Sequence, residues 1–242
     1  MLNSWIDITV PVRTLVRQNP AIFYPLCRAY FPNQKINIVQ EDTQIVIEGF
    51  PRSANTFAVI AFFQSQPEPV KMAHHLHAAA QIIRAVKWKI PTLVLLRNPK
   101  DAALSSISAF PQYSIYRSLS YYISFYSAIY DYQDSYIIGE FEEVTQNYDQ
   151  IIKRINTKFN TNFAVWENTP ANKQKVYDIM GGQLNTSFPS KILKIKNNAE
   201  EERRRKLIEE IQSNKYAAML EEANQIYQIF KQTALTQKLI HT

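Results

Sequence analysis

Two short, continuous apolar runs interrupt the mixed polar pattern of this chain, and both have the length of a β-strand. The first is Ile45–Phe50 (IVIEGF) and the second is Pro91–Leu96 (PTLVLL), each bounded by turn-forming residues. A run without alternation is typical of a strand that is covered on both faces in a parallel sheet. Segments with helical character follow both runs. This order predicts an α/β fold with a mainly parallel central sheet and flanking helices.

Local spacing predicts further elements around these two strands. Residues 1–40 show no clear period and predict an irregular or partly helical lead-in. The other expected elements are a helix within residues 73–88, a long aromatic helix after residue 115 with Tyr122, Tyr126 and Tyr130 at steps of four, a strand at Ser135–Phe141 and a helix at Tyr148–Phe159. The tail Ala199–Lys231 predicts two helices, the second with one apolar face: Met219, Leu220, Ala223, Ile226, Tyr227 and Phe230.

Size and composition fit one globular domain that spans residues 1–242. The chain is 46% hydrophobic and 20% charged, as in ordinary soluble proteins. Within this domain, the α/β core is expected at about residues 44–165 and a helical C-terminal part at about 199–231. A single cysteine, the lack of an apolar run of about 20 residues, and an N-terminus unlike a signal peptide together predict a cytoplasmic protein with no transmembrane segment.

The charge of the chain favours an anionic partner, which leaves nucleic acid, a membrane surface or a phosphorylated small molecule open. The net charge is +6 and the pI is about 9.2, and positive residues cluster at 191–196 and 203–206. The second cluster follows three glutamates, which indicates a solvated helix start rather than a DNA-binding stripe. No nucleic-acid partner is therefore expected.

The segment GFPRSANTF, Gly49–Phe57, follows the first predicted strand and has the features of an anion-binding loop. Gly49 permits a tight exit from the strand, and Ser53 and Ala54 are small enough for backbone amides to approach a ligand. The next helix directs its free N–H groups and positive dipole end into this loop. Arg52 adds a forked cationic donor. A βα turn with a surface arginine is the alternative interpretation.

A second segment of this kind, RNPKDAALSS, follows the second predicted strand. Asn98 and Pro99 predict a helix start, with Asn98 as the cap. Arg97 ends the strand, and Ser105 lies about two turns into the helix, so that both side chains could hold one phosphate. A capped helix with a solvent-facing arginine is the alternative. Two such sites at successive strand ends suit a ligand with phosphates at both ends of a nucleoside.

These segments resemble those of the sulfotransferases that use PAPS (3′-phosphoadenosine-5′-phosphosulfate), including bacterial members of the family. GFPRSANTF is similar to the family's 5′-phosphosulfate loop, RNPKDAALSS to its 3′-phosphate segment, and GEFEEV (139–144) to its third strand end. The resemblance implies a fold like that of the P-loop NTPases and transfer of a sulfuryl group from PAPS to a hydroxyl or amine acceptor, which releases PAP. It also implies these donor-binding residues: Arg52, Ser53, Ala54, Asn55, Thr56, Phe57, Arg97, Ser105 and Phe141.

The resemblance further places a catalytic base in Ala73–Leu76 (AHHL), where the family has Lys-Thr-His-Leu. His75 matches the base, and an alanine stands where the family has its lysine, so Arg52 would carry more of the leaving-group charge. Three interpretations compete with this one: a helix-start role for the histidines, a metal site of His74, His75 and His77, and a base role for Glu48. The metal site is disfavoured because neighbouring residues of a helix point about 100° apart, and no metal is expected.

Other parts of the sequence leave function open. The family's late R-K-G loop is absent, and Lys191, Lys194, Lys196 and Arg203–Arg205 are possible substitutes. The acceptor could be a small molecule, a glycan or a lipid. Two other functions compete: a small-molecule kinase, which lacks support because the loop has no Gly-Lys-[Ser/Thr] sequence, and a non-catalytic nucleotide- or RNA-binding module.

Overall fold

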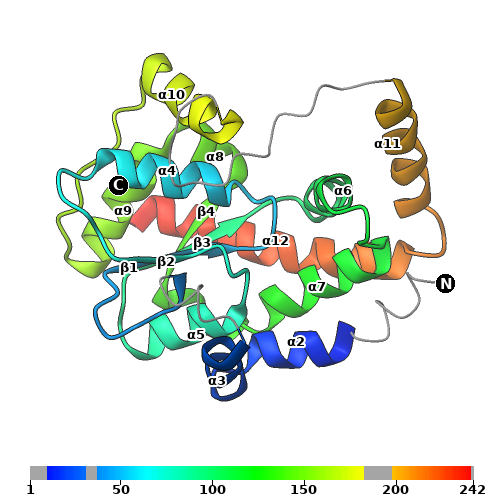
Figure 1. Cartoon of the computed structure of the whole chain (residues 1–242), viewed down its shortest axis with the longest axis horizontal. Helices are drawn as coiled ribbons and strands as arrows, with labels where there is room; N and C mark the ends of the chain where they lie inside the picture. Colours follow the sequence, from blue (N-terminus) through cyan, green and yellow to red (C-terminus); the bar gives the residue numbers. More distant parts are fainter. Residues whose placement is uncertain (1–9, 31–36, 183–197, 241–242) are drawn as a thin grey trace.

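The structure, a computed structural model, describes residues 10–30, 37–182 and 198–240, and its centre is a sheet of four parallel strands (Figure 1). The strands are β1 (Ile45–Gly49), β2 (Met72–His74), β3 (Thr92–Leu96) and β4 (Ile137–Glu140), in the order β2-β1-β3-β4. The predicted α/β fold with a parallel central sheet is confirmed.

Helices cover both faces of this sheet and follow it at the C-terminus. They are α2 (Val10–Gln18), α3 (Pro20–Tyr30), α4 (Asn55–Ser65), α5 (Ala79–Lys87), α6 (Pro99–Ala109), α7 (Ile115–Ser127), the 3₁₀ helix η2 (Tyr130–Ser135), α8 (Phe141–Gln146), α9 (Tyr148–Phe159), α10 (Pro170–Gly181), α11 (Asn198–Ile211) and α12 (Ala217–Ile240). None of the helices in the described ranges combines the length and apolar character needed to cross a bilayer.

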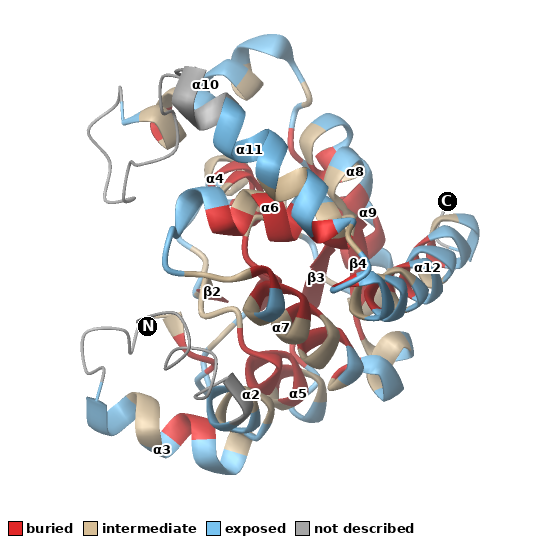
Figure 2. Ribbon diagram, turned by 90° about the vertical axis from the view of Figure 1, so that its right-hand side faces the viewer, coloured by how far each residue is buried: buried red, intermediate tan, exposed pale blue. Residues whose placement is uncertain are grey.

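Side chains of the central strands point alternately to the two faces of the sheet, both of which are buried, and this explains the continuous apolar runs. Ile47 and Leu95 contribute to the core beneath α4, α9 and α10, whereas Val94, Leu96 and Ile138 contribute to the core with α5, α6, α7 and α12. Buried segments accordingly run through the centre of the molecule in Figure 2. Because both faces of the sheet are covered, polar chemistry is left to the ends of the strands.

The predictions for the flanking helices are largely confirmed. Asn98 caps α6 by accepting a hydrogen bond from the Asp101 amide, with Pro99 at the first helical position. Helix α9 has the predicted bounds, and the tail forms α11 and α12. The predicted apolar face of α12 packs into the core beside α7. The N-terminal segment is more helical than predicted, since α2 and α3 both form there.

Three local predictions are wrong. The segment 73–88 is not helical from its start, because Met72–His74 pairs with β1 as an edge strand and α5 begins only at Ala79. The aromatic helix α7 ends at Ser127, so that Tyr130 falls in η2 and is exposed. The fourth strand is shorter than predicted, since Phe141 already begins α8.

Candidate active site

The candidate site lies at the carboxyl ends of β1 and β3, where the topology of the sheet changes direction. From β1 the chain proceeds to β2 on one side, and from β3 it proceeds to β4 on the other. Ligand crevices of open parallel sheets lie at such points. Arg52 follows β1 and Arg97 follows β3, so both predicted arginines lie at this one point.

The β1–α4 loop, residues 49–54, is shaped by close packing and by an unusual backbone. A Cβ atom at Gly49 would lie 2.6 Å from the Leu95 carbonyl oxygen, so only glycine fits there. Arg52 and Ala54 have φ angles of 68° and 67°, whereas Ser53 between them does not have a positive φ. Backbone that alternates in this way forms concave nests of N–H groups that bind anions.

The start of α4 leaves this nest open to a ligand. Ala54 is the N-cap residue, and no side chain caps the helix. The first N–H groups of α4 therefore lack a capping side chain, and such groups attract anions together with the helix dipole. Asn55 is buried and donates from Nδ2 to the Phe50 carbonyl oxygen at 2.9 Å, which fixes the loop. The Phe57 ring lies in the core, 5.7 Å from that of Tyr177, so only the backbone of Phe57 is available to a ligand in the nest.

The structure brings Arg52, Arg97 and Ser105 together, and the side-chain contact of Ser105 is with Arg52. Arg52 Nε donates to Ser105 Oγ at 3.1 Å, and Arg97 Nη1 donates to the Arg52 carbonyl oxygen at 2.7 Å. Burial lowers the pKa of both guanidinium groups. The two guanidinium groups are half-buried and lie next to an N–H nest. An anion with several oxygens can bind there and neutralise both positive charges.

The surroundings of Arg97 extend the site toward β4 and α11. The Arg97 guanidinium lies 4.0 Å from the centre of the Phe141 ring, and Tyr122 donates to the Arg97 carbonyl oxygen at 2.8 Å. Burial has the largest effect on the pKa of Arg97 and lowers it. Asp101 raises this pKa, whereas Arg52 and Arg204 of α11 lower it. Arg204 is thus within electrostatic range of Arg97. Lys191, Lys194 and Lys196, the other predicted substitutes for the late loop, lie outside the described residues.

The histidine turn, residues 75–77, lies against the β1–α4 loop. His75 and His77 have φ angles of 60° and 51°. His75 Nε2 lies 3.2 Å from Thr56 Oγ1, and its Nδ1 lies 2.8 Å from His74 Nδ1. If His75 donates from Nδ1 to His74, its Nε2 accepts from Thr56 and is free of a proton, which is the form that a general base requires.

Burial keeps the three clustered histidines neutral at pH 7. It lowers the pKa of His74 and of His77 to about 4 and that of His75 to about 3, with further lowering at His75 from its two histidine neighbours. His77 Nδ1 donates to the Gly49 carbonyl oxygen at 2.8 Å, which fixes its tautomer. Within the described residues, no group of three or more histidine, cysteine or acidic side chains has the geometry of a metal site.

Glu48, the second candidate for the base, is fully buried at the end of β1. Its Oε1 accepts from the Leu76 amide at 2.9 Å and its Oε2 from the His77 amide at 3.0 Å. Burial raises the pKa of Glu48 to about 7, and these two amides act in the opposite direction. Because both oxygens are occupied by the turn, Glu48 is poorly placed to receive a proton from a ligand.

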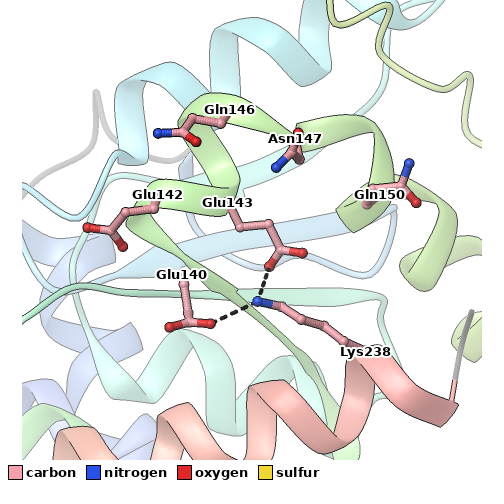
Figure 3. Close-up of a pocket in the computed structure, with 7 residues that line it drawn as sticks. All are labelled: Glu140, Glu142, Glu143, Gln146, Asn147, Gln150 and Lys238. Atoms are coloured by element: carbon pink, nitrogen blue, oxygen red, sulfur yellow. Dashed lines mark hydrogen bonds and ion pairs between the residues drawn. The ribbon is translucent and has the colours of Figure 1, made fainter.

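A separate hollow of about 390 Å³ opens beyond β4 and is acidic (Figure 3). Lys238 of α12 bridges Glu140 at 2.8 Å and Glu143 at 3.4 Å, and Arg154 binds Glu143 with two hydrogen bonds of 2.6 and 3.0 Å. The carboxylates of Glu140 and Glu143 therefore already have internal cations, and a hollow with this many acidic groups repels phosphate.

Two residues of the site were not identified from the sequence. Tyr121 of α7 donates its hydroxyl to the His77 carbonyl oxygen, and Arg17 of α2 donates to that same hydroxyl. Neither residue belongs to a recognisable motif. Tyr121 lies in an aromatic run in which most rings are core, and Arg17 precedes the site by more than thirty residues.

Comparison with known proteins gives no match in sequence and a structural match of low similarity. No protein-family model matches this sequence, and no curated protein matches it. Among solved structures, mouse sulfotransferase SULT7A1 complexed with PAP aligns over 80% of this chain and 92% of its own, with 11% sequence identity and a TM-score of 0.40. Likeness at this level assigns neither a family nor an activity, so inferences about function rest on the residues of the site.

Proposed function

We propose that this chain is a sulfotransferase that uses PAPS as donor and transfers its sulfuryl group to a hydroxyl or amine acceptor. The observation that carries the proposal is the joining of Arg52, Arg97 and Ser105 at one point, through contacts of 3.1 and 2.7 Å. Two cationic groups at neighbouring strand ends suit a ligand with phosphate at both its 5′ and 3′ positions.

In the proposed complex, the 5′-phosphosulfate lies in the β1–α4 loop. The nest around Ser53, the N–H groups at the start of α4, and Arg52 hold its oxygens. Asn55 stands where a kinase loop would have its lysine and is buried with its amide bonded to Phe50, which disfavours ATP chemistry. This assignment gives Arg52 the charge that develops on the leaving oxygen.

The 3′-phosphate and adenine lie on the β3 side of the loop. Arg97 and Ser105 bind the 3′-phosphate, and Arg204, within electrostatic range of Arg97, adds a third cation. Phe141, whose ring packs on the Arg97 guanidinium at 4.0 Å, offers an apolar surface to the base. The 3′-phosphate thereby gains contacts that a nucleotide without this group cannot make.

The reaction that fits these groups is an in-line displacement. The acceptor oxygen or nitrogen attacks sulfur, the bond from sulfur to the 5′-phosphate oxygen breaks, and PAP leaves with the electron pair. His75 Nε2 takes the acceptor proton, because the ring is neutral at pH 7; the acceptor hydroxyl or amine then replaces Thr56 Oγ1, 3.2 Å away, as the donor to Nε2. The low pKa of the His75 ring makes it a weak base in the free protein, and the negative charge of bound PAPS raises that pKa.

Thermal unfolding with nucleotides tests this function. PAP is expected to raise the Tm at micromolar concentrations, because it carries both phosphates, whereas ATP and RNA are expected to have little effect. The proposal is wrong if ATP or RNA stabilises the protein and PAP does not. Release of PAP from PAPS, measured with a panel of phenols, alcohols and amines, then tests the chemical step, and His75→Ala should abolish it while PAP still binds.

A further inference from the structure

The histidine turn adopts a backbone that its sequence does not favour. His75 and His77 both lie in the left-handed region, and Leu76 between them does not. A left-handed residue other than glycine is strained, so this conformation persists only where surrounding contacts determine it. Two such residues within three positions indicate that the turn is held from outside.

Glu48 supplies the principal contact from the sheet. The alternation of φ along the turn directs the amides of Leu76 and His77 toward one point, and the Glu48 carboxylate occupies it with bonds of 2.9 and 3.0 Å. The turn is thus a second backbone nest, and its anion is a side chain of the same protein. Glu48 is completely buried, so solvent does not compete for these bonds.

Tyr121 and Gly49 hold the turn from two other directions. The Tyr121 hydroxyl donates to the His77 carbonyl oxygen and accepts from Arg17, which ties helices α2 and α7 to the turn. The Gly49 carbonyl oxygen accepts from His77 Nδ1 at 2.8 Å. The amide, carbonyl and ring of His77 are therefore all engaged, whereas the ring of His75 makes its polar contacts with Thr56 and His74.

We propose that Glu48 and Tyr121 are positioning residues, which hold the turn 75–77 so that the His75 ring faces the start of α4 in a single tautomer. This inference rests on the proposed function for its catalytic meaning, since His75 acts as a base only in that reaction. Glu48 itself touches no substrate. Its role is to accept the two amide hydrogen bonds around which the turn folds.

The decisive variant is Glu48→Gln, which keeps the shape of the side chain and removes one of its two acceptors. One of the two amides then faces the NH₂ group of glutamine, which cannot accept. Tyr121→Phe removes the hydroxyl that contacts the His77 carbonyl oxygen and serves as the second variant if Glu48→Gln fails to fold. Tyr136→Phe is the matched control, because it deletes a buried hydroxyl that donates to Ile129, away from the turn.

Side-chain NMR of ¹⁵N-histidine protein, recorded at pH 7.5 with and without PAP, gives a readout independent of activity. The wild type should show one fixed tautomer for His75, assigned by its loss in His75→Gln. Glu48→Gln and Tyr121→Phe should bring the two ring nitrogen shifts of His75 together, as exchange between tautomers does, and Tyr136→Phe should leave them unchanged. Unchanged shifts in both turn variants would overturn the proposal.

Turnover measurements separate this proposal from the proposed function. With PAPS and 2-naphthol or another active acceptor, Glu48→Gln should lower kcat by roughly tenfold or more, up to the 10²–10⁴-fold that a general base contributes, while the Kd for PAP stays within about twofold. A wild type that binds no PAP would refute the proposed function but leave the tautomer result standing. A Glu48→Gln variant with mobile His75 and normal kcat would refute the positioning role.

Discussion

Replacing Arg97 with glutamine tests whether Arg97 binds the 3′-phosphate while Arg52 binds the 5′-phosphate. Arg97 uses Nη1 to bind the Arg52 carbonyl oxygen, which leaves four of its five N–H donors for a ligand. A hydrogen bond from a charged group contributes about 1.5–3 kcal/mol, so the loss should weaken PAP binding by roughly 10- to 150-fold.

The same substitution also affects the folded protein, but by less. It removes one hydrogen bond to Arg52 and the contact with Phe141, which together stabilise the fold by about 1–3 kcal/mol. For a chain of this size, each kcal/mol corresponds to about 2–4 °C in Tm. Arg97→Gln should therefore remain folded at 25 °C, where binding is measured.

Calorimetric titration with two ligands provides the assay. PAP carries a 3′-phosphate and 5′-AMP does not, so Arg97→Gln should weaken PAP strongly and 5′-AMP by less than about threefold. Arg52→Gln should weaken both ligands, because Arg52 serves the 5′ side. Arg28→Gln, on the surface of α3, is the control and should change neither affinity. If Arg97→Gln weakened PAP and 5′-AMP equally, Arg97 would not be the 3′-phosphate ligand.

Three further outcomes follow from the fold. Arg154→Met should leave the Glu143 carboxylate without its bidentate partner and lower the free energy of unfolding, measured by urea denaturation, by about 3–5 kcal/mol. A change below about 1 kcal/mol would show that Lys238 alone is enough to neutralise Glu143. Gly49→Ala should prevent stable folding or lower Tm by several degrees, because its Cβ would meet a carbonyl oxygen at 2.6 Å, and an unchanged melting curve would contradict this packing. The free energy of unfolding should rise with pH between about 4 and 6.5, because the three clustered histidines, with pKa values of about 3 to 4, stay neutral in the folded protein while the unfolded chain binds protons there. Glu48, with its pKa raised to about 7, acts in the opposite direction, but it binds one proton where the histidines exclude three. Denaturation midpoints that fall over this range would refute the assignment.

The sequence was sufficient to predict the two central strands of the sheet and the position of an arginine at the end of each. Continuous apolar runs of strand length identify β1 and β3 because both faces of these strands are covered. Arg52 and Arg97 each follow one of these strands, and parallel strands bring their carboxyl ends to one edge. Topology therefore brings the two arginines to the same edge, and the hydrogen bond from Arg97 to the Arg52 carbonyl oxygen joins them there.

The histidine turn could not be predicted from local sequence, because strand pairing and tertiary contacts determine its backbone. Residues 73–88 have helix-compatible spacing, but Met72–His74 pairs with the edge of β1. The helix α5 therefore begins only at Ala79. The left-handed angles of His75 and His77 depend on Glu48, which is distant in sequence. Propensity is local, whereas this conformation is set by tertiary contacts.

Position 52 shows two requirements in conflict. Its backbone, with φ at 68°, is one that glycine adopts without strain, yet the proposed chemistry requires a cation there. Substitution by glycine is expected to relax the loop and to remove the charge, so stability and activity should change in opposite directions at this single residue. At position 54, which has the same backbone but no charge, Ala54→Gly should relax the loop without that penalty. The left-handed backbone therefore lowers stability at both positions, and the proposed function gives a reason to avoid glycine only at position 52.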